Sequence, residues 1–204
     1  MGAELVAWSF TTGWASGINA YAVVVVMGLL GRFAHVSAIP GALQRTDVLI
    51  VAAILFLLEM FADKIPYIDS TWDTVHTAIR PVVGATVGYL IGNQNSSLDA
   101  AVFAATGGVT ALISHFAKAG IRLGVNSSPE PVSNVVVSTA EDVAVTGVIS
   151  LAAAQPFVAA GIAAVLLVVG VILAFWLFRR VRRLKRRYDE WGERTFGSTI
   201  APAD

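Results

Sequence analysis

The sequence contains no cysteine and few charged residues for its length. Only 14% of its 204 residues are Asp, Glu, Lys or Arg, against about a quarter in a typical soluble domain. Without cysteine there is no disulfide, thiolate nucleophile or cysteine metal site. The three histidines form no His-Glu-x-x-His signature, and no Gly-x-Ser-x-Gly nucleophile elbow is present. We therefore expect a protein that is not an enzyme; the alternative is a lipid-modifying enzyme that uses Asp69, Asp73 and a divalent metal.

Hydrophobic residues make up 56% of the chain, and the mean hydropathy is +0.71. Several apolar runs approach the roughly 20 residues that cross about 30 Å of hydrocarbon. The pattern predicts an all-α, polytopic membrane helix bundle of about six transmembrane spans in residues 1–178, located in the cell membrane. The expected spans are Ala3–Gly31, Asp47–Ala62, Pro81–Gly92, Leu98–Val125, Val132–Ala154 and Pro156–Phe178. The third is short, so we expect it either to begin earlier, near Asp73, or to be re-entrant.

Seven of the 14 basic residues lie in the run RRVRRLKRR, Arg179 to Arg187, directly after the last apolar segment. Cytoplasmic loops are enriched in Lys and Arg, so this run places the C-terminus in the cytoplasm, and six spans then place the N-terminus there as well. We expect residues 179–204 to form a basic juxtamembrane helix and a flexible cytoplasmic tail. The expected partners are the bilayer and anionic lipids at the basic run, where each charge is worth about 1 kcal/mol. A homo-oligomer is left open, and no nucleic-acid partner is expected.

The two halves of the chain share some features. Gly13, Ser16, Gly17 and Asn19 interrupt the first span, and Gly107-Gly108 weaken the fourth. Three spans followed by three spans run in opposite directions, as in transporters built from inverted repeats with broken or re-entrant helices. The pattern therefore suggests a three-plus-three inverted repeat.

Ionisable residues inside the apolar runs are the strongest functional signal. Glu59 and Asp63 are four residues apart, so both carboxylates lie on one helix face, and Glu141-Asp142 interrupts a later span. A charge at the centre of a membrane helix costs roughly 2.5 to 3.5 kcal/mol. We therefore expect these groups to face the bundle interior, where they pair with each other or line a wet cavity.

Basic residues have the same spacing. His115, Lys118 and Arg122 form a stripe at three- and four-residue steps, and Asp69, Asp73, His76 and Arg80 share one face after Pro66. We expect the second group to lie on a short helix at the membrane interface or at a cytoplasmic gate.

The stretches Asp63-Lys64-Ile65-Pro66 and Asn126-Ser127-Ser128-Pro129-Glu130-Pro131, with the Glu141-Asp142 pair, resemble a bacterial membrane family catalogued only as a domain of unknown function. The likeness runs from about Gly13 to Asp142 and implies fold relatives without an established activity. Glu59-Met-Phe-Ala-Asp63-Lys64 is also similar to the Glu-x-Gly-Asp-Lys-Thr motif of calcium and manganese transporters, with one extra residue between the acids and neither the glycine nor the threonine. That similarity implies cation ligands at Glu59 and Asp63.

The leading hypothesis is a membrane transporter of small ions. Hard oxygen ligands suit a divalent cation such as Ca, Mn or Mg, and the predicted ligands are Glu59, Asp63, Glu141 and Asp142. Lys64, Lys118, Arg122 and Asn19 complete the predicted binding site. One alternative is a transporter of an anionic lipid headgroup or phosphate that uses Lys118 and Arg122; another is a membrane subunit that does not transport.

Overall fold

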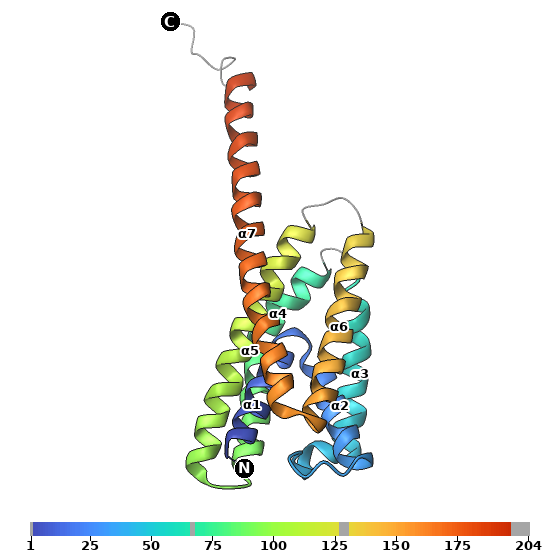
Figure 1. Cartoon of the computed structure of the whole chain (residues 1–204). Helices are drawn as coiled ribbons and strands as arrows, with labels where there is room; N and C mark the ends of the chain where they lie inside the picture. The colour runs from blue at the N-terminus through green and yellow to red at the C-terminus, as the bar shows by residue number, and fades with distance from the viewer. Residues whose placement is uncertain (1, 66–67, 127–130, 197–204) are drawn as a thin grey trace, which may run out of the picture.

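The computed structural model describes residues 2–65, 68–126 and 131–196. These residues form seven α-helices and one 3₁₀ helix, and they contain no strand (Figure 1). Pro66 and residues 127–130 of the two proline motifs, and the tail from 197, lie outside the described residues. The elements are α1 (Gly2–Ile18), α2 (Ala20–Phe33), η1 (Gly41–Gln44), α3 (Thr46–Ala62), α4 (Ile68–Gly92), α5 (Ser97–Asn126), α6 (Pro131–Ala154) and α7 (Pro156–Phe196).

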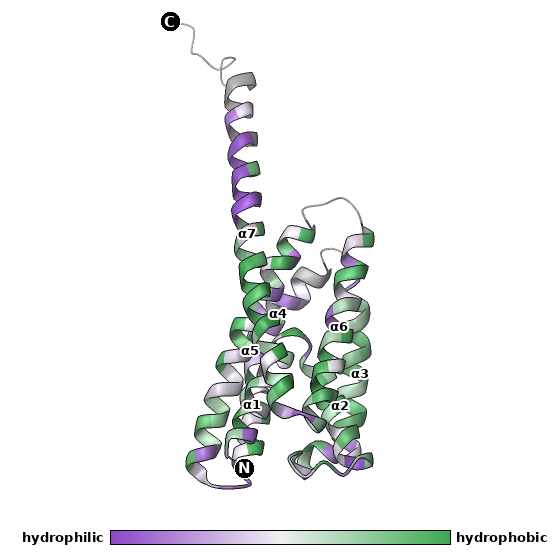
Figure 2. Cartoon of the chain, viewed as in Figure 1, coloured by the Kyte–Doolittle hydropathy of each residue, from purple (hydrophilic) through white to green (hydrophobic). Residues whose placement is uncertain are grey.

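The bundle is apolar outside, and its interior combines an apolar core with buried charged side chains. Exposed apolar side chains cover α3 and α7, among them Ile54, Phe61, Val165 and Ile172, while Glu59 and other charged side chains are buried. Figure 2 shows this as green outer faces on the bundle and a purple upper part of α7. Three stretches are long and apolar enough to cross a membrane: Ser97–Asn126, Val132–Ala154 and Pro156–Arg187. The chain is therefore a helical membrane protein.

The first two helices, α1 and α2, form a helical hairpin, the α1–α2 hairpin, which turns inside the bundle. The chain turns at Asn19, whose backbone is extended (φ −145°, ψ 97°) and whose Oδ1 accepts a hydrogen bond from the Ala22 amide at 2.9 Å. The start of α1 and the end of α2 lie at the same end of the bundle, where Glu4 is beside the loop after α2 and the α4–α5 loop. The structure thus differs from the expected single span over Ala3–Gly31. The N-terminal end of α1 and the basic part of α7 lie at opposite ends of the bundle (Figure 1).

Glycines bring α1, α4 and α5 into backbone contact. A Cβ added to Gly13 would lie 2.6 Å from the Gly107 oxygen, and one added to Gly107 would lie 2.3 Å from the Gly84 oxygen. Small residues allow this close approach between membrane helices. Ser9 Oγ adds an interhelical hydrogen bond to the Phe103 carbonyl at 2.7 Å. Gly107-Gly108 therefore form a packing seam inside a continuous α5, and not the break that the sequence suggested.

The expected repeat is not seen in the helix arrangement. The first half would begin with the α1–α2 hairpin and the second half with α5, but α5 is uninterrupted over 30 residues. The segment Pro81–Gly92 belongs to the 25-residue helix α4, which starts at Ile68, so it is not re-entrant. The predicted polar face after Pro66 is thus part of a long helix, with Asp73, His76 and Arg80 buried in the bundle.

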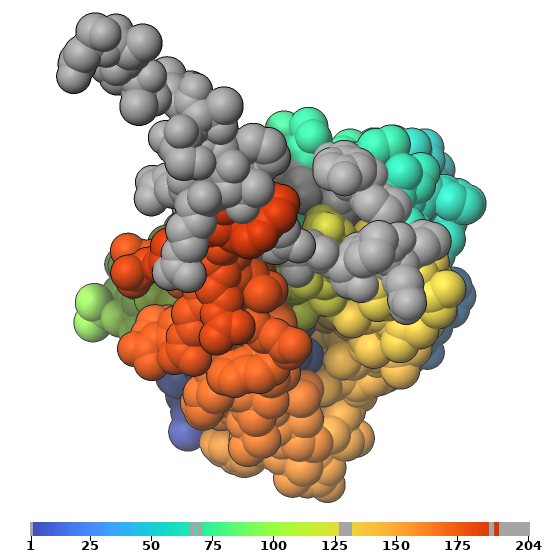
Figure 3. All heavy atoms as spheres, turned by 90° about the horizontal axis from the view of Figure 1, so that it is seen from above, coloured from blue at the N-terminus to red at the C-terminus, as the bar shows by residue number. Residues whose placement is uncertain are grey.

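Helix α7 continues well beyond the other helices and carries the basic run Arg179–Arg187 (Figures 1 and 2). The helix continues without a break from its apolar part into its basic part. At this boundary the Arg179 guanidinium stacks over the Phe175 ring, 4.2 Å from the ring centroid. Viewed onto that end of the molecule, α6 and α7 lie on one side of the bundle and the α3–α4 ends lie on the other (Figure 3).

Candidate functional site: a buried network of charges

Two carboxylates on α3 point into the bundle. Glu59 and Asp63 are one turn apart, and only 0% and 2% of their surfaces are exposed. Asp63 is the C-cap residue of α3, where its negative charge meets the negative end of the helix dipole. This position is unfavourable unless cations are close. Basic side chains from α4 and α5 supply them, in two adjoining clusters.

The first cluster is centred on Arg80 of α4. Its Nη2 donates a hydrogen bond to Glu59 Oε1 at 2.6 Å, and its Nη1 donates to His115 Nδ1 at 2.9 Å. Nη1 is also 2.8 Å from Asp73 Oδ1, an ion pair by distance that lacks hydrogen-bond alignment. Arg80 is completely buried. A buried guanidinium stays charged, so its surroundings must supply the compensating negative groups.

Two histidines adjoin this cluster, and donor–acceptor matching fixes their tautomers. A guanidinium can only donate, so His115 Nδ1 accepts and its Nε2 proton faces Thr77 Oγ1 at 2.9 Å. A backbone carbonyl can only accept, so His76 Nδ1 donates to Trp72 O at 2.8 Å. His76 Nε2 then accepts from the Tyr21 hydroxyl at 3.0 Å. These contacts suit neutral imidazoles at both positions.

The second cluster is centred on Lys118 of α5. Its Nζ lies 2.6 Å from Asp63 Oδ2 and 2.9 Å from the carbonyl oxygen of Ile18, with Glu141 Oε2 at 3.7 Å. The Ile18 carbonyl belongs to the last turn of α1, where helix carbonyls lack an intrahelical partner. The ammonium of Lys118 therefore binds oxygens from three helices, α1, α3 and α6.

Arg122 joins Asp63 to α6. One nitrogen, Nη1, donates to the Asp63 carbonyl at 2.9 Å and to Asn134 Oδ1, and Nη2 donates to Glu141 Oε2 at 2.8 Å. Asp142, the neighbour of Glu141, points elsewhere and accepts a hydrogen bond from Asn19 Nδ2 at 3.0 Å. Glu141 thus belongs to the charge network, whereas Asp142 contacts the turn between α1 and α2.

The network has more negative than positive groups. Counted as ionised, its four carboxylates exceed its three cations by one: Glu59, Asp63, Asp73 and Glu141 against Arg80, Lys118 and Arg122. Within the described residues, Glu59 Oε2 and Asp63 Oδ1 are buried and have no hydrogen-bond partner. Buried charges need compensation, so these two oxygens are the places where one more positive charge is best accommodated.

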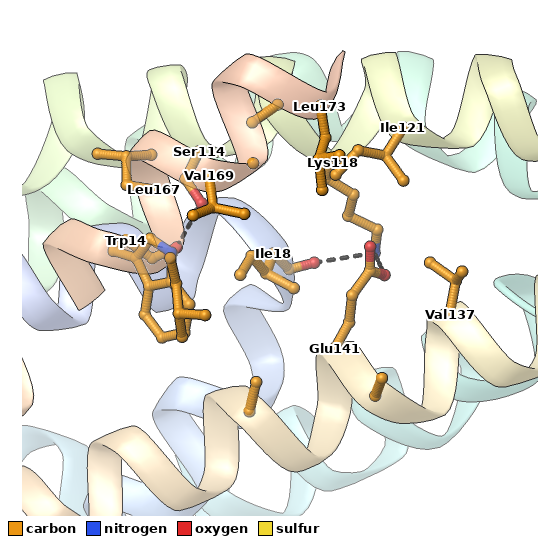
Figure 4. Close-up of a pocket in the computed structure, with 15 residues that line it drawn as sticks. Trp14, Ile18, Ser114, Lys118, Ile121, Val137, Glu141, Leu167, Val169 and Leu173 are labelled. Atoms are coloured by element: carbon orange, nitrogen blue, oxygen red, sulfur yellow. Dashed lines mark hydrogen bonds and ion pairs between the residues drawn. The ribbon is translucent and has the colours of Figure 1, made fainter. Parts of the chain in front are cut away.

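A cavity of about 330 Å³ adjoins the second cluster, between α1, α5, α6 and α7. Trp14 and Ser114 lie at one end, and Lys118 and Glu141 lie toward the other, with Val137 beyond them (Figure 4). The walls between them are mostly Ala, Val, Ile and Leu side chains.

Five of the eight predicted site residues lie in the two clusters, whereas Lys64, Asn19 and Asp142 do not. Lys64 turns back to donate to the Met60 carbonyl of its own helix at 2.9 Å and joins neither cluster. The predicted metal ligands Glu59, Asp63 and Glu141 face Arg or Lys, and Asp142 faces Asn19. In the described part of the chain, no three His, Asp or Glu side chains gather in a geometry that could hold a metal ion. Lys118 and Arg122, the candidate headgroup ligands, are likewise paired with carboxylates.

The predicted cation site did not include Arg80, although Arg80 links three helices. The signal was present in the steps Asp73, His76 and Arg80, but the same spacing also fits a surface helix. Tyr21 and Asn134 were missed as well, because single polar residues in an apolar run have no periodicity.

The apolar exterior and the buried charges define a helical membrane protein with a network of charges inside the bundle. The chain belongs to the family described as Domain of unknown function (DUF4126), whose model matches residues 6–179. No match was found among the curated proteins, and none among the solved structures.

Proposed function

We propose that this protein transports a small cation across the cell membrane, with the α3 carboxylates as the binding groups. One observation carries the proposal: among the described residues the buried network holds one more carboxylate than cations, and Glu59 Oε2 and Asp63 Oδ1 have neither a hydrogen bond nor an ion pair. An intramembrane ionisable residue is a candidate for ion or proton passage by default. Structural pairing alone would favour equal numbers of the two charges.

Lys118 gives the site a means of exchange. Its ammonium is held by Asp63, by Glu141 and by the Ile18 carbonyl, all of them hard oxygen ligands that also suit Ca, Mn or Mg. A cation that enters this group must displace the ammonium, and the displaced side chain then leaves. Binding of the cation is thereby coupled to movement of α5 relative to α1 and α6.

We propose a topology of five crossings, by α3 to α7, with the α1–α2 pair entering and leaving on one side. Seven basic residues follow the last crossing, while Arg32 and Arg45 lie at the other end. The positive-inside rule then places the C-terminus in the cytoplasm and the N-terminus outside.

The test is cation flux in proteoliposomes that contain the full chain. Glu59→Gln and Asp63→Asn keep size and hydrogen-bonding capacity but remove the charge, and we expect each to abolish flux of protons or divalent cations while the protein stays folded. Asp47→Asn is the matched control, because Asp47 is on the same helix with 65% of its side chain exposed. Undiminished flux in both interior variants, or no flux by the unaltered protein for any of these ions, would refute the proposal.

A further inference from the structure

The cavity beside the second cluster has the composition of a lipid-chain site. Ala117, Ala144 and Gly170 line it together with larger aliphatic residues, and its polar groups lie at Ser114, Lys118 and Glu141. A Cβ added to Gly170 would meet only Ala117 Cβ, at 3.5 Å. A volume of about 330 Å³ with apolar walls and few polar groups is typical of small-molecule sites.

The depth of the cavity indicates what surrounds its opening. On α7 it extends from Leu166 to Leu173, which are thirteen and six residues before Arg179. At 1.5 Å per residue, the cavity lies about 9 to 20 Å below the start of the basic run. One leaflet contributes about 15 Å of the roughly 30 Å hydrocarbon core, so the cavity begins among the acyl chains of the leaflet next to the basic run and ends near the middle of the bilayer.

The opening lies between α6 and α7. These helices meet at Gln155 and diverge toward the basic end (Figure 1). Val169 and Leu173 on α7 are 46% and 45% exposed, and Ala140 on α6 is also exposed, although all three line the cavity. The rim is therefore apolar and open to the side.

We propose that one acyl chain of a membrane phospholipid enters between α6 and α7 and occupies this cavity. The end of the chain reaches Trp14, and a part nearer the ester passes Lys118 and Glu141, which lie on the Leu173 side of the cavity (Figure 4). The lipid would then adjoin the Lys118–Glu141 pair and influence the charge network. This inference does not depend on cation transport.

The experiment uses Trp14 as a reporter. Trp14 and Trp8 are both on α1 and both 3% exposed, but only Trp14 lines the cavity. Two single-tryptophan proteins, one retaining Trp14 and one retaining Trp8, are placed in phosphatidylcholine bilayers whose chains are brominated at a series of depths. We expect strong loss of Trp14 emission, largest for bromines near the chain end, and little loss for Trp8. The plug variant Ala140→Phe should remove the difference, whereas Val143→Phe, at a neighbouring and 68% exposed position, should not.

A second measurement needs no tryptophan replacement. Native mass spectrometry of the otherwise unaltered chain, extracted from phospholipid vesicles, should show one retained phospholipid, which is lost in Ala140→Phe and kept in Val143→Phe. Equal quenching of Trp14 and Trp8, or retention that Ala140→Phe does not change, would overturn the proposal. Quenching of Trp14 by a brominated free fatty acid but not by the phospholipid would also overturn it. None of these results depends on Glu59 or on flux.

Discussion

Arg80 holds together polar side chains from three helices. It contacts Glu59 on α3, Asp73 on its own helix and His115 on α5, all within 3 Å. A guanidinium presents its donors in a fixed planar fork, so it can bind several partners at once where an ammonium binds as a point charge. Arg80 is thus both the main counter-ion of Glu59 and the element that fixes its orientation.

Replacement of Arg80 should therefore be strongly destabilising. In Arg80→Met an extended apolar side chain replaces the guanidinium and leaves Glu59 and Asp73 without their cation. Breaking a buried ion pair in this way costs about 3 to 5 kcal/mol. Thermal unfolding in detergent should show a large fall in Tm. Arg45→Met is the control, since the Arg45 side chain is 66% exposed and pairs only at the surface. Equal Tm values for the two variants would mean that Arg80 is not a structural counter-ion.

At the scale of elements, α1 depends on two features to end inside the bundle. Glycines allow α1 to pack closely against α4 and α5. Polar side chains of α5 donate hydrogen bonds to carbonyl oxygens near the end of α1. Ser114 Oγ donates to the Trp14 carbonyl at 2.7 Å, and Lys118 donates to the Ile18 carbonyl. A helix that ends among apolar side chains needs such donors, because unsatisfied backbone groups in a membrane cost several kcal/mol each.

The glycine seam predicts a sharp size limit. In Gly107→Ala the new Cβ would lie 2.3 Å from the Gly84 oxygen, and overpacking of this kind costs about 1 to 3 kcal/mol. We expect a lower Tm by differential scanning fluorimetry. Gly147→Ala should keep or raise the Tm, because a Cβ there meets nothing within 4 Å and alanine is the better helix former by about 1 kcal/mol. The reverse order of the two variants would contradict the seam.

These elements also show what the sequence could predict. The bounds of α5 and α6 and the start of α7 were predicted to within a few residues, because apolar runs mark these helices directly. The breakers around Asn19 correctly marked an interruption, but a straight broken span and a reversal have the same local pattern. Only the pairing of α1 with α5, about 100 residues away, distinguishes them. The facing of Glu59, Asp63, Lys118, Arg122 and Glu141 was predictable from burial cost, whereas their partner Arg80 was not.

For the whole molecule, the depth at which the α1–α2 hairpin turns explains the position of the buried charge network. Ile18 meets Lys118, and α5 continues for eight more residues to Asn126, which is about 12 Å at 1.5 Å per residue. In the half of the bundle next to the basic run, α1 and α2 therefore leave space that the side chains of α3 to α6 fill. The charge network occupies that half.

The proposed topology can be tested without removing any native cysteine, since the chain has none. Single cysteines at Glu4, Asn95 and Arg183 should divide between the two sides of the membrane. Positions 4 and 95 should react with an impermeant maleimide from outside intact cells, and position 183 only after permeabilisation. Labelling of 4 together with 183, and not with 95, would mean that residues 3–31 cross the membrane completely.

The central claim is that a cation binds at the α3 carboxylates, and infrared difference spectroscopy of the reconstituted protein tests it most directly. Addition of the transported cation should shift the carboxylate bands, since Glu59 Oε2 and Asp63 Oδ1 acquire a partner. The Glu59 part of the shift should be absent in Glu59→Gln, and the Asp63 part should be absent in Asp63→Asn. The full shift should remain in Asp47→Asn. Spectra in which no tested cation changes a carboxylate band, or in which the change persists in both interior variants, would contradict the account.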